Sequence, residues 1–335
     1  MPSSAVYSFT EPDAYFASIR TAEVKGVVTA RGDYRAEMTR IDLHRLRMQR
    51  GAENLPRVMN VRRRDPRVSV FFMTEQEQAS LHVRGMELAK DEIAVLGTGS
   101  ADHHLSSAAS RWGSMSLTPE DFVAAGRAIV GRELSAPSSL THRLRPSPAL
   151  LSRLLNLHEA AGHLAKTAPD ILEQPEVARA LEQSLVQAMI SCISGGDAAE
   201  AGSIDHRHAM IMRRLEELLE QNTDRTLSLA ELCAAARASD RTLRVCCHEH
   251  LGMSPMRYLW LRRMHLARRA LRTADPATAT VTEIAANFGF WELGRFSVEY
   301  RSLFGESPSA TLRRPPEGLG PQKGIGSPWK LPESA

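Results

Sequence analysis

Apolar and polar residues alternate in the part of the chain between Val58 and Leu96. Val68, Val70 and Phe72, for example, are separated from one another by single residues. Such a period of two is typical of strands with one buried face. Because these runs follow one another closely, the pattern predicts an antiparallel meander or a small barrel.

A helical period replaces this alternation after Ser147. Pro148 suits the first turn of a helix, and leucines follow it at helical spacing. A second helix is expected from Pro175 to Gly195, with an apolar stripe made by Val177, Leu181, Leu185, Met189 and Ile193. Both helices are amphipathic, so we expect them to pack on the strand-rich region or on a second copy of the chain.

Small and polar residues mark the boundaries of the predicted domains. The segment GGDAAEAGS, which begins at Gly195, contains no large apolar residue and is typical of a linker. We therefore expect a strand-rich domain over 1–194, a linker over 195–204 and a helical domain over 205–314. The remainder, 315–335, is rich in Pro and Gly and is expected to be disordered.

The helical domain begins with the pattern of a helix-turn-helix unit. Ser228 and Glu231 have the spacing of a capping box at the start of a short helix. A break follows at Arg237, and Ser239 can cap the next helix, in which Cys246 and Cys247 face inward. A short helix, a tight turn and a second helix with outward arginines form the geometry that enters a major groove of DNA.

The same arrangement returns about 50 residues later. Thr280 or Thr282 can cap a helix, Gly289 closes it, and a new helix is expected from Glu292. Both units end in a hydrophobic-Gly-x-Ser-Pro sequence. The helix predicted between them, over 255–273, would be roughly 27 Å long, enough to hold two reading helices about one DNA turn apart.

The charge distribution supports binding to a polyanion. Basic residues comprise 37 arginines and 5 lysines. Residues 205–314 contain 17 arginines against 13 acidic residues, a net charge of +4, whereas residues 1–204 have a net charge of −1. This asymmetry favours nucleic acid as the partner of the C-terminal part, although a charge of +4 is by itself ordinary.

At these residues the chain resembles the AraC/XylS family of bacterial transcription regulators. The resemblance covers roughly residues 210–314 and is carried by Leu251-Gly252-Met253-Ser254-Pro255 and by the run GFWELGRFSVEYRSLFGESPSATLRR from Gly289. It implies an all-α C-terminal domain with two helix-turn-helix units that read adjacent major grooves of double-stranded DNA. It also implies an α+β N-terminal domain, a cupin-like barrel with appended helices, for sensing and dimerisation.

The resemblance assigns site residues position by position. It implies that the first reading helix presents Arg241, Arg244 and Val245 to bases, and the second Leu293, Gly294, Arg295 and Val298. Ser297 and Arg301 would face phosphates. The family usually has Gly where this chain has Arg237, Arg where it has Val245, and Phe where it has Cys247.

Metal and thiol chemistry has weaker support. Residues 246–250 (CCHEH) invite a zinc interpretation, but no second ligand pair follows at finger-like spacing, so both cysteines are expected in the core. His103 and His104 lack the further ligands of a metal-dependent cupin enzyme. An alkyl-transfer repair protein needs a reactive cysteine, and residues 1–191 contain none. We therefore expect no metal, no cofactor and no enzymatic activity.

The sequence thus predicts a DNA-binding transcription regulator, an activator that responds to a small-molecule effector, contacts RNA polymerase and forms a homodimer. Two alternatives stay open, a regulator without an effector and, less favoured, a cupin-type enzyme fused to a DNA-binding domain. No apolar run approaches ~20 residues and no basic-then-apolar start is visible, so we expect a cytoplasmic protein without a membrane span.

Overall fold

The computed structural model describes residues 2–20, 22–63, 65–75, 77–97, 101–135, 142–198, 203–223, 225–314 and 322–323. Its strands are β1 (Ser3–Phe9), β2 (Ala22–Val28), β3 (Ala36–Asp42), β4 (Arg47–Glu53), β5 (Arg57–Arg63), β6 (Val68–Met73), β7 (Leu81–Val83), β8 (Met86–Leu88), β9 (Ile93–Leu96), β10 (Ala101–Ser106), β11 (Ser110–Leu117), β12 (His142–Arg145), β13 (Asp197–Ala198) and β14 (Gln322–Lys323). Its helices are α1 (Pro12–Ser18), α2 (Pro119–Val130), α3 (Pro148–Thr167), α4 (Pro169–Glu173), α5 (Pro175–Ser194), α6 (Ser203–Gln221), α7 (Leu229–Ala236), α8 (Asp240–Leu251), α9 (Pro255–Thr273), α10 (Val281–Asn287), α11 (Leu293–Phe304) and α12 (Pro308–Arg313).

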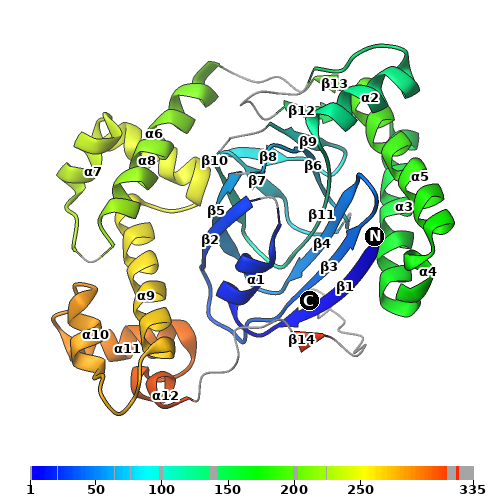
Figure 1. Ribbon diagram of the computed structural model, residues 1–335. Helices are drawn as coiled ribbons and strands as arrows, with labels where there is room; N and C mark the ends of the chain where they lie inside the picture. Colours follow the sequence, from blue (N-terminus) through cyan, green and yellow to red (C-terminus); the bar gives the residue numbers. More distant parts are fainter. Residues whose placement is uncertain are drawn as a thin grey trace.

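Two antiparallel sheets face each other in the N-terminal part of the chain and form its barrel (Figure 1). The larger sheet has the order β13-β12-β9-β6-β11-β4-β3-β1-β14, and the smaller one β2-β5-β10-β7-β8. Aromatic and aliphatic side chains fill the space between them, among them Tyr15, Phe71 and Trp112. The predicted strand-rich domain is confirmed, although its strands already begin at Ser3.

The two long helices of the N-terminal part cover the outer face of the larger sheet. Pro148 and Pro175 stand at the start of α3 and α5, as expected from the sequence. Leu185 and Met189 of α5 are fully buried in the core that these helices share with the sheet. The central part of the predicted apolar stripe therefore packs within its own chain.

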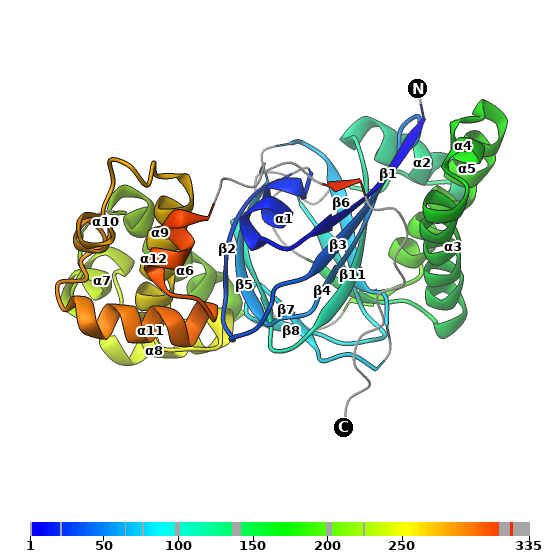
Figure 2. The ribbon, with the colours of Figure 1, turned by 90° about the horizontal axis from the view of Figure 1, so that it is seen from below.

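The smaller sheet carries the C-terminal helices on its outer face. Figures 1 and 2 show these helices on the opposite side of the barrel from α3 and α5. Val27 and Val58 of the sheet share a hydrophobic cluster with Ile211, Met212 and Leu215 of α6. The barrel and the helical domain are thus joined by a packed apolar interface.

Two segments called linker or tail from the sequence are only partly described. Asp197–Ala198, within the predicted linker, forms the short strand β13 beside β12. Residues 199–202 lie outside the described residues. Of the tail expected to be disordered, Gln322–Lys323 pairs with β1 as β14, and the other residues from 315 onward lie outside the described residues. None of the helices that the structure describes combines the length and apolarity needed to span a bilayer.

Candidate nucleic-acid interface

The first helix-turn-helix unit consists of α7 and α8. The Ser228 Oγ atom accepts from the Glu231 amide at 3.3 Å, and the Glu231 carboxylate accepts from the Ser228 amide at 2.8 Å, which completes the predicted capping box. Arg237 ends α7 in a left-handed conformation, with φ of 52°. Ser239 then caps α8 through the amide of Thr242. These local bonds fix the turn that sets α8 against α7.

The second unit, α10 and α11, repeats this construction. Thr280 and Glu283 form the reciprocal capping box of α10. Gly289 supplies the left-handed residue of the turn, with φ of 74°, and a Cβ atom there would lie 2.4 Å from the hydroxyl oxygen of Thr226. Phe296 and Tyr300 of α11 are buried, which turns the opposite face of α11 to solvent.

The long helix α9 connects the two units. It spans Pro255–Thr273 and is capped by Ser254, in agreement with the helix predicted from the sequence. Figure 2 shows α8 and α11 along the lower edge of the helical domain, with α9 above them. The reading helices α8 and α11 are therefore exposed on the same side of the domain, as binding to two adjacent major grooves on one face of DNA requires.

All predicted DNA-contacting residues lie on exposed surface of α8 or α11. They are Arg241, Arg244, Val245, Leu293, Gly294, Arg295, Ser297, Val298 and Arg301. Val298 is 71% exposed, which is unusual for a valine unless its face has a partner. Their contacts with DNA stay a prediction.

Two of these arginines already have a carboxylate neighbour. Arg244 Nε lies 2.7 Å from Asp240 Oδ1, and Arg295 Nε lies 2.9 Å from Glu299 Oε1. In each pair the acid stands on the same helix, four residues away. The Nε atom is occupied in both, so any further directional contact of the guanidinium involves its terminal nitrogens.

Sequence reasoning missed one exposed aromatic residue. Trp291, in the loop before α11, is 76% exposed. It stands beside Leu293 and thus at the entry of the second reading helix. Phe290 and Phe296 fill the core of the second unit, and Trp291 is not part of that core.

The cysteines of the first unit belong to its core. Cys246 and Cys247 are fully buried, as the core interpretation predicted. Burial raises the pKa of the Cys246 thiol to about 11 and that of Cys247 further. Among the described residues no group of three or more His, Cys, Asp or Glu side chains is arranged to hold a metal ion.

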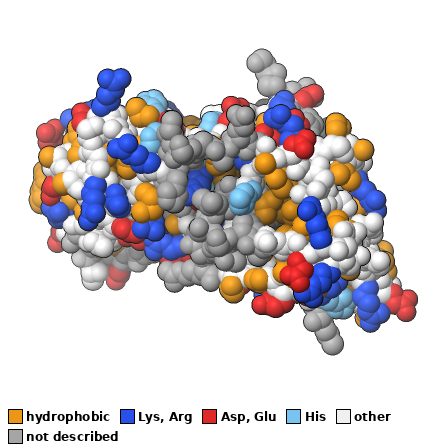
Figure 3. Space-filling view, turned by 90° about the horizontal axis from the view of Figure 1, so that it is seen from above, with side chains coloured by type: hydrophobic (Ala, Val, Ile, Leu, Met, Phe, Trp, Pro, Cys, Tyr) orange, Lys and Arg blue, Asp and Glu red, His pale blue; other side chains and the backbone are white. Residues whose placement is uncertain are grey.

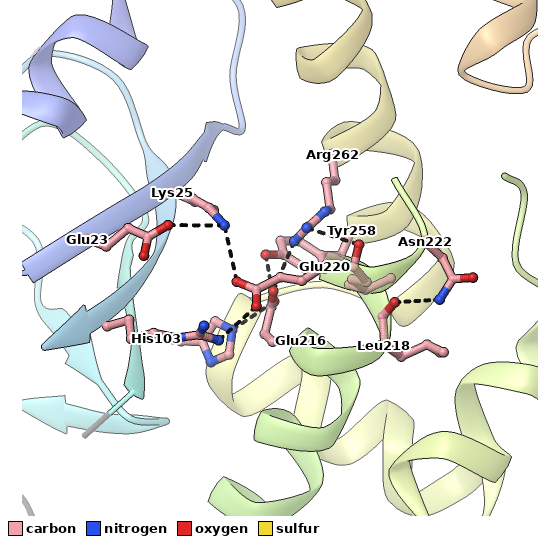
Figure 4. Close-up of polar contacts among 11 residues, drawn as sticks. Glu23, Lys25, His103, Glu216, Leu218, Glu220, Asn222, Tyr258 and Arg262 are labelled. Carbon is pink, nitrogen blue, oxygen red and sulfur yellow. Dashed lines mark hydrogen bonds and ion pairs between the residues drawn. The ribbon is translucent and has the colours of Figure 1, made fainter. Parts of the chain in front are cut away.

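The barrel meets helices α6 and α9 of the helical domain through a buried polar network (Figure 4). Glu216 of α6 accepts from the hydroxyl of Tyr258 at 2.8 Å and from Arg262 at 3.0 Å, and His103 Nε2 of the barrel lies 3.0 Å from it. Burial opposes its ionisation, but these neighbours outweigh that cost and lower the pKa of Glu216 to about 2. A charged carboxylate therefore sits at the centre of the domain interface.

Three arginines in the C-terminal half of α9 are paired with carboxylates of the barrel domain. Arg268 and Arg272 bind Glu11, and Arg269 binds Asp13, both acids lying at the start of α1. An arginine-rich helix between two DNA-reading helices could also neutralise DNA phosphates. For these residues the structure places the negative partner within the chain, 256 or more positions away.

A cavity of about 530 Å³ lies where the barrel meets the second unit. Its lining combines both domains and both signs of charge: Glu11, Tyr34, His265, Arg268, Phe304 and Glu306. The cavity is large enough for a small organic molecule.

Figure 3 shows the molecule from above. On this face Lys and Arg side chains are spread over the helical lobe among acidic ones.

Comparisons with known proteins agree with this geometry. Residues 232–314 match the family model described as a helix-turn-helix domain. The chain is 37% identical over 154 residues to the probable thc operon regulatory protein of Rhodococcus erythropolis, covering 43% of this chain and 46% of that protein. It is 38% identical over 99 residues to the XylDLEGF operon transcriptional activator 2 of Pseudomonas putida, covering 30% of this chain and 63% of that protein. The C-terminal domain is thus similar to transcription regulators of the AraC/XylS type.

One solved structure is also similar to this chain in sequence. The probable AraC family transcriptional regulator from Rhodopseudomonas palustris CGA009 is 36% identical and covers 31% of this chain and 94% of that chain, with a TM-score of 0.28. The chain spans less than two thirds of the length of the two curated relatives above. The likeness to AraC/XylS proteins thus concerns mainly the two helix-turn-helix units.

The departures from the AraC/XylS pattern are accommodated locally. Arg237 occupies the left-handed turn position where the family usually has Gly, at a conformational cost that a glycine would avoid. Val245 leaves the outer face of α8 without a guanidinium at that position, and Cys247 fills the core with a small side chain.

Proposed function

We propose that this protein is a sequence-specific DNA-binding transcription regulator. The observation that carries the proposal is the pair of capped helix-turn-helix units, joined by α9, with their reading helices exposed along one edge. Arg241, Arg244, Val245, Leu293, Gly294, Arg295 and Val298 would contact bases, and Ser297 and Arg301 phosphates. Footprinting on the DNA upstream of its own gene and the neighbouring genes tests this. A protein that protects no discrete segment there or in a random pool would contradict it.

We propose further that residues 1–194 form the sensing and dimerisation domain, residues 195–204 the linker and residues 205–314 the DNA-binding domain. The relative named above as a transcriptional activator supports activation, and with it a contact with RNA polymerase, as the mode of action. A reporter gene behind the footprinted segment distinguishes activation from repression. Loss of reporter expression when the gene for this protein is deleted supports activation, and a gain of reporter expression contradicts it.

The cavity between the barrel and the second unit supports a small-molecule effector. Thermal-shift screening of catabolic metabolites with the full chain tests this. An alternative regulator without an effector has an observation of its own, since the barrel interior is packed by Tyr15, Phe71, Trp112 and their neighbours. If no metabolite shifts the unfolding temperature or changes DNA affinity, the alternative is favoured.

A homodimer is part of the proposal, but the apolar stripe of α5 no longer supports it. Leu185 and Met189 are buried against the sheet of the same chain. Sedimentation of the full chain at tens of micromolar decides the oligomeric state. A monomer under those conditions, with and without DNA, would contradict the dimer.

A further inference from the structure

A hydrogen-bonded chain links the connecting helix to the second reading helix. The indole Nε1 of Trp260, in α9, donates to Glu299 Oε2 at 2.9 Å. The other carboxylate oxygen of Glu299 accepts from Arg295 Nε at 2.9 Å. Both oxygens of Glu299 are therefore used, one to hold the acid on α9 and one to hold the arginine. The guanidinium of Arg257 lies 4.2 Å from the centre of the Trp260 ring, which adds a cation–π contact on the α9 side.

The hydrogen bonds from Trp260 to Glu299 and from Arg295 to Glu299 fix the direction of the Arg295 side chain. Arg295 is 71% exposed, so without a second anchor its guanidinium would sample many rotamers. Glu299 is only 28% exposed. Partial burial opposes its ionisation, but the bonds from Arg295 and Trp260 outweigh this and lower the pKa of the carboxyl. With Nε bonded to a charged and anchored acid, the two terminal nitrogens remain as an outward fork.

An outward fork of two N–H groups matches the O6 and N7 acceptors of guanine. We propose that Trp260 is a positioning residue, which acts through Glu299 to preset Arg295 as the guanine-reading side chain of the second half-site. This inference rests on the proposed function. It assigns to that half-site a G·C pair opposite Arg295, whose neighbouring predicted base-contacting side chains, Leu293 and Val298, are apolar.

The first unit offers an internal comparison. Arg244 is bonded through Nε to Asp240 in the same i, i+4 relation. Asp240 is 53% exposed, however, and no other described side chain donates a hydrogen bond to it. Its carboxylate is not anchored to a second helix. Arg244 is consequently oriented less strongly than Arg295, although the two arginines have the same local sequence relation to their acids.

The test is selection of bound sequences from a random DNA pool by the full chain and three variants. Arg295→Ala identifies the base pair that Arg295 reads, as the position at which a guanine preference disappears. Trp260→Phe keeps an aromatic ring that can contact Arg257 but removes the N–H donor. We expect it to lower the guanine preference at that same base pair by about fivefold or more, within the range of roughly 5- to 150-fold for one bidentate contact. Other positions should keep their preferences.

Combining Trp260→Phe with Arg295→Ala separates positioning from general stability. The double variant should have the base preferences of Arg295→Ala alone, because the indole acts only through the arginine. Glu299→Gln, which retains the size of the side chain but loses its charge, should reproduce the effect of Trp260→Phe. Asp240→Asn serves as the matched control and should change the first half-site by less than about twofold. Thermal unfolding of each variant verifies that it is folded.

Three outcomes overturn the inference. Folded Trp260→Phe and Glu299→Gln proteins that keep the wild-type guanine preference would show that Arg295 needs no positioning. A loss of preference spread over both half-sites would show a structural effect only, and an Arg295→Ala protein with the wild-type motif would remove the reader itself. A wild-type chain that selects no sequence would overturn the proposed function as well, and this distinguishes the two failures.

Discussion

Glu11 and Arg268 lie 257 residues apart in the chain and form a two-pronged ion pair across the domain interface, with N–O distances of 2.7 and 3.1 Å. Each side chain is only 14% exposed. Arg272 binds the same carboxylate, and Arg268 also approaches Glu306 of the second unit at 3.7 Å. The start of α1 therefore holds the C-terminal half of α9, and with it the second unit, against the barrel.

Glu11→Gln should destabilise the protein by about 2–3 kcal/mol, because it removes a negative charge that two largely buried guanidinium groups contact. Equilibrium unfolding in urea measures this. Asp13→Asn is the matched control, since its partner Arg269 is about half exposed, and it should cost less than about 1 kcal/mol. Equal losses in the two variants would contradict the importance of burial at Glu11.

Stability should fall in acid because of Glu216. Its pKa is about 2 in the folded protein against an ordinary value of 4.5, so its contribution is complete above about pH 4.5 and is lost as the pH falls towards 2. The loss amounts to about 2–3 kcal/mol. Unfolding in urea at several pH values measures it, and Glu216→Gln should flatten that part of the profile. Burial lowers the pKa of His104 and of His250 to about 3. Their protonation therefore adds a further loss of stability as the pH falls below about 6.5, and this loss should occur in the wild-type and the Glu216→Gln protein alike.

Arg237→Gly should stabilise the first unit. A non-glycine residue in the left-handed region costs roughly 1–2 kcal/mol, and the greater freedom of glycine in the unfolded chain offsets about half of that. A net gain of up to about 1 kcal/mol should appear as a higher unfolding temperature. Gly252→Ala is the opposite test, because φ is 68° there and the added Cβ would lie 3.2 Å from Leu105. It should lower that temperature, and a loss of stability in Arg237→Gly would contradict the strain.

The sequence predicted those parts of the molecule that carry local signals. Capping residues such as Ser228 and Glu231 stand three positions apart, and the turns that follow are marked by the next cap or by Gly289. Pro148 and Pro175 mark the starts of α3 and α5 in the same local way, because proline suits the first turn of a helix. Local signals therefore suffice to predict both helix-turn-helix units and both long helices.

Other parts depend on contacts between distant residues. Strand β4 has the sequence RMQRGAE, in which Arg47, Arg50 and Glu53 hide the usual alternation. It is nevertheless a strand, because it pairs with β3 on one side and β11 on the other. Its Glu53 carboxylate is buried and binds Arg57 at 3.0 Å. Neither this pair nor the contact between Glu11 and Arg268 has a periodic signal, so the strands before Val58 and the domain interface could not be predicted.

Salt dependence should separate the arginines that face DNA from those held within the chain. The slope of log K against log salt is about −0.9 for each phosphate neutralised. Arg301→Ala should make that slope less negative by about 0.9 and weaken binding to all sequences alike, because Arg301 is exposed on α11. Arg272→Ala should leave the slope unchanged, since Arg272 is paired with Glu11 and is only 12% exposed. Titration of a footprinted DNA segment at several salt concentrations measures both, and equal slopes for the two variants would contradict the assignment.

The two units should differ in how strictly they read bases. Arg241 and Arg244 of α8 can each offer a fork of donors to guanine, whereas α11 offers one such side chain, Arg295, beside Leu293 and Val298. Apolar side chains can contact a thymine methyl but form no directional pair. Arg244→Ala should therefore cost at least ~1 kcal/mol of binding free energy and relax selectivity at one or two base pairs.

Leu293→Ala is the counterpart in the second unit and should weaken binding with a smaller change in base preference. The anchored Arg295 retains its own base pair in this variant, because neither Trp260 nor Glu299 is altered. Selection from a random pool with each variant measures both effects on one scale. If Arg244→Ala recovers the wild-type motif while Leu293→Ala rewrites a half-site, then shape and apolar contact at the second unit dominate recognition, and the first unit contributes mainly affinity.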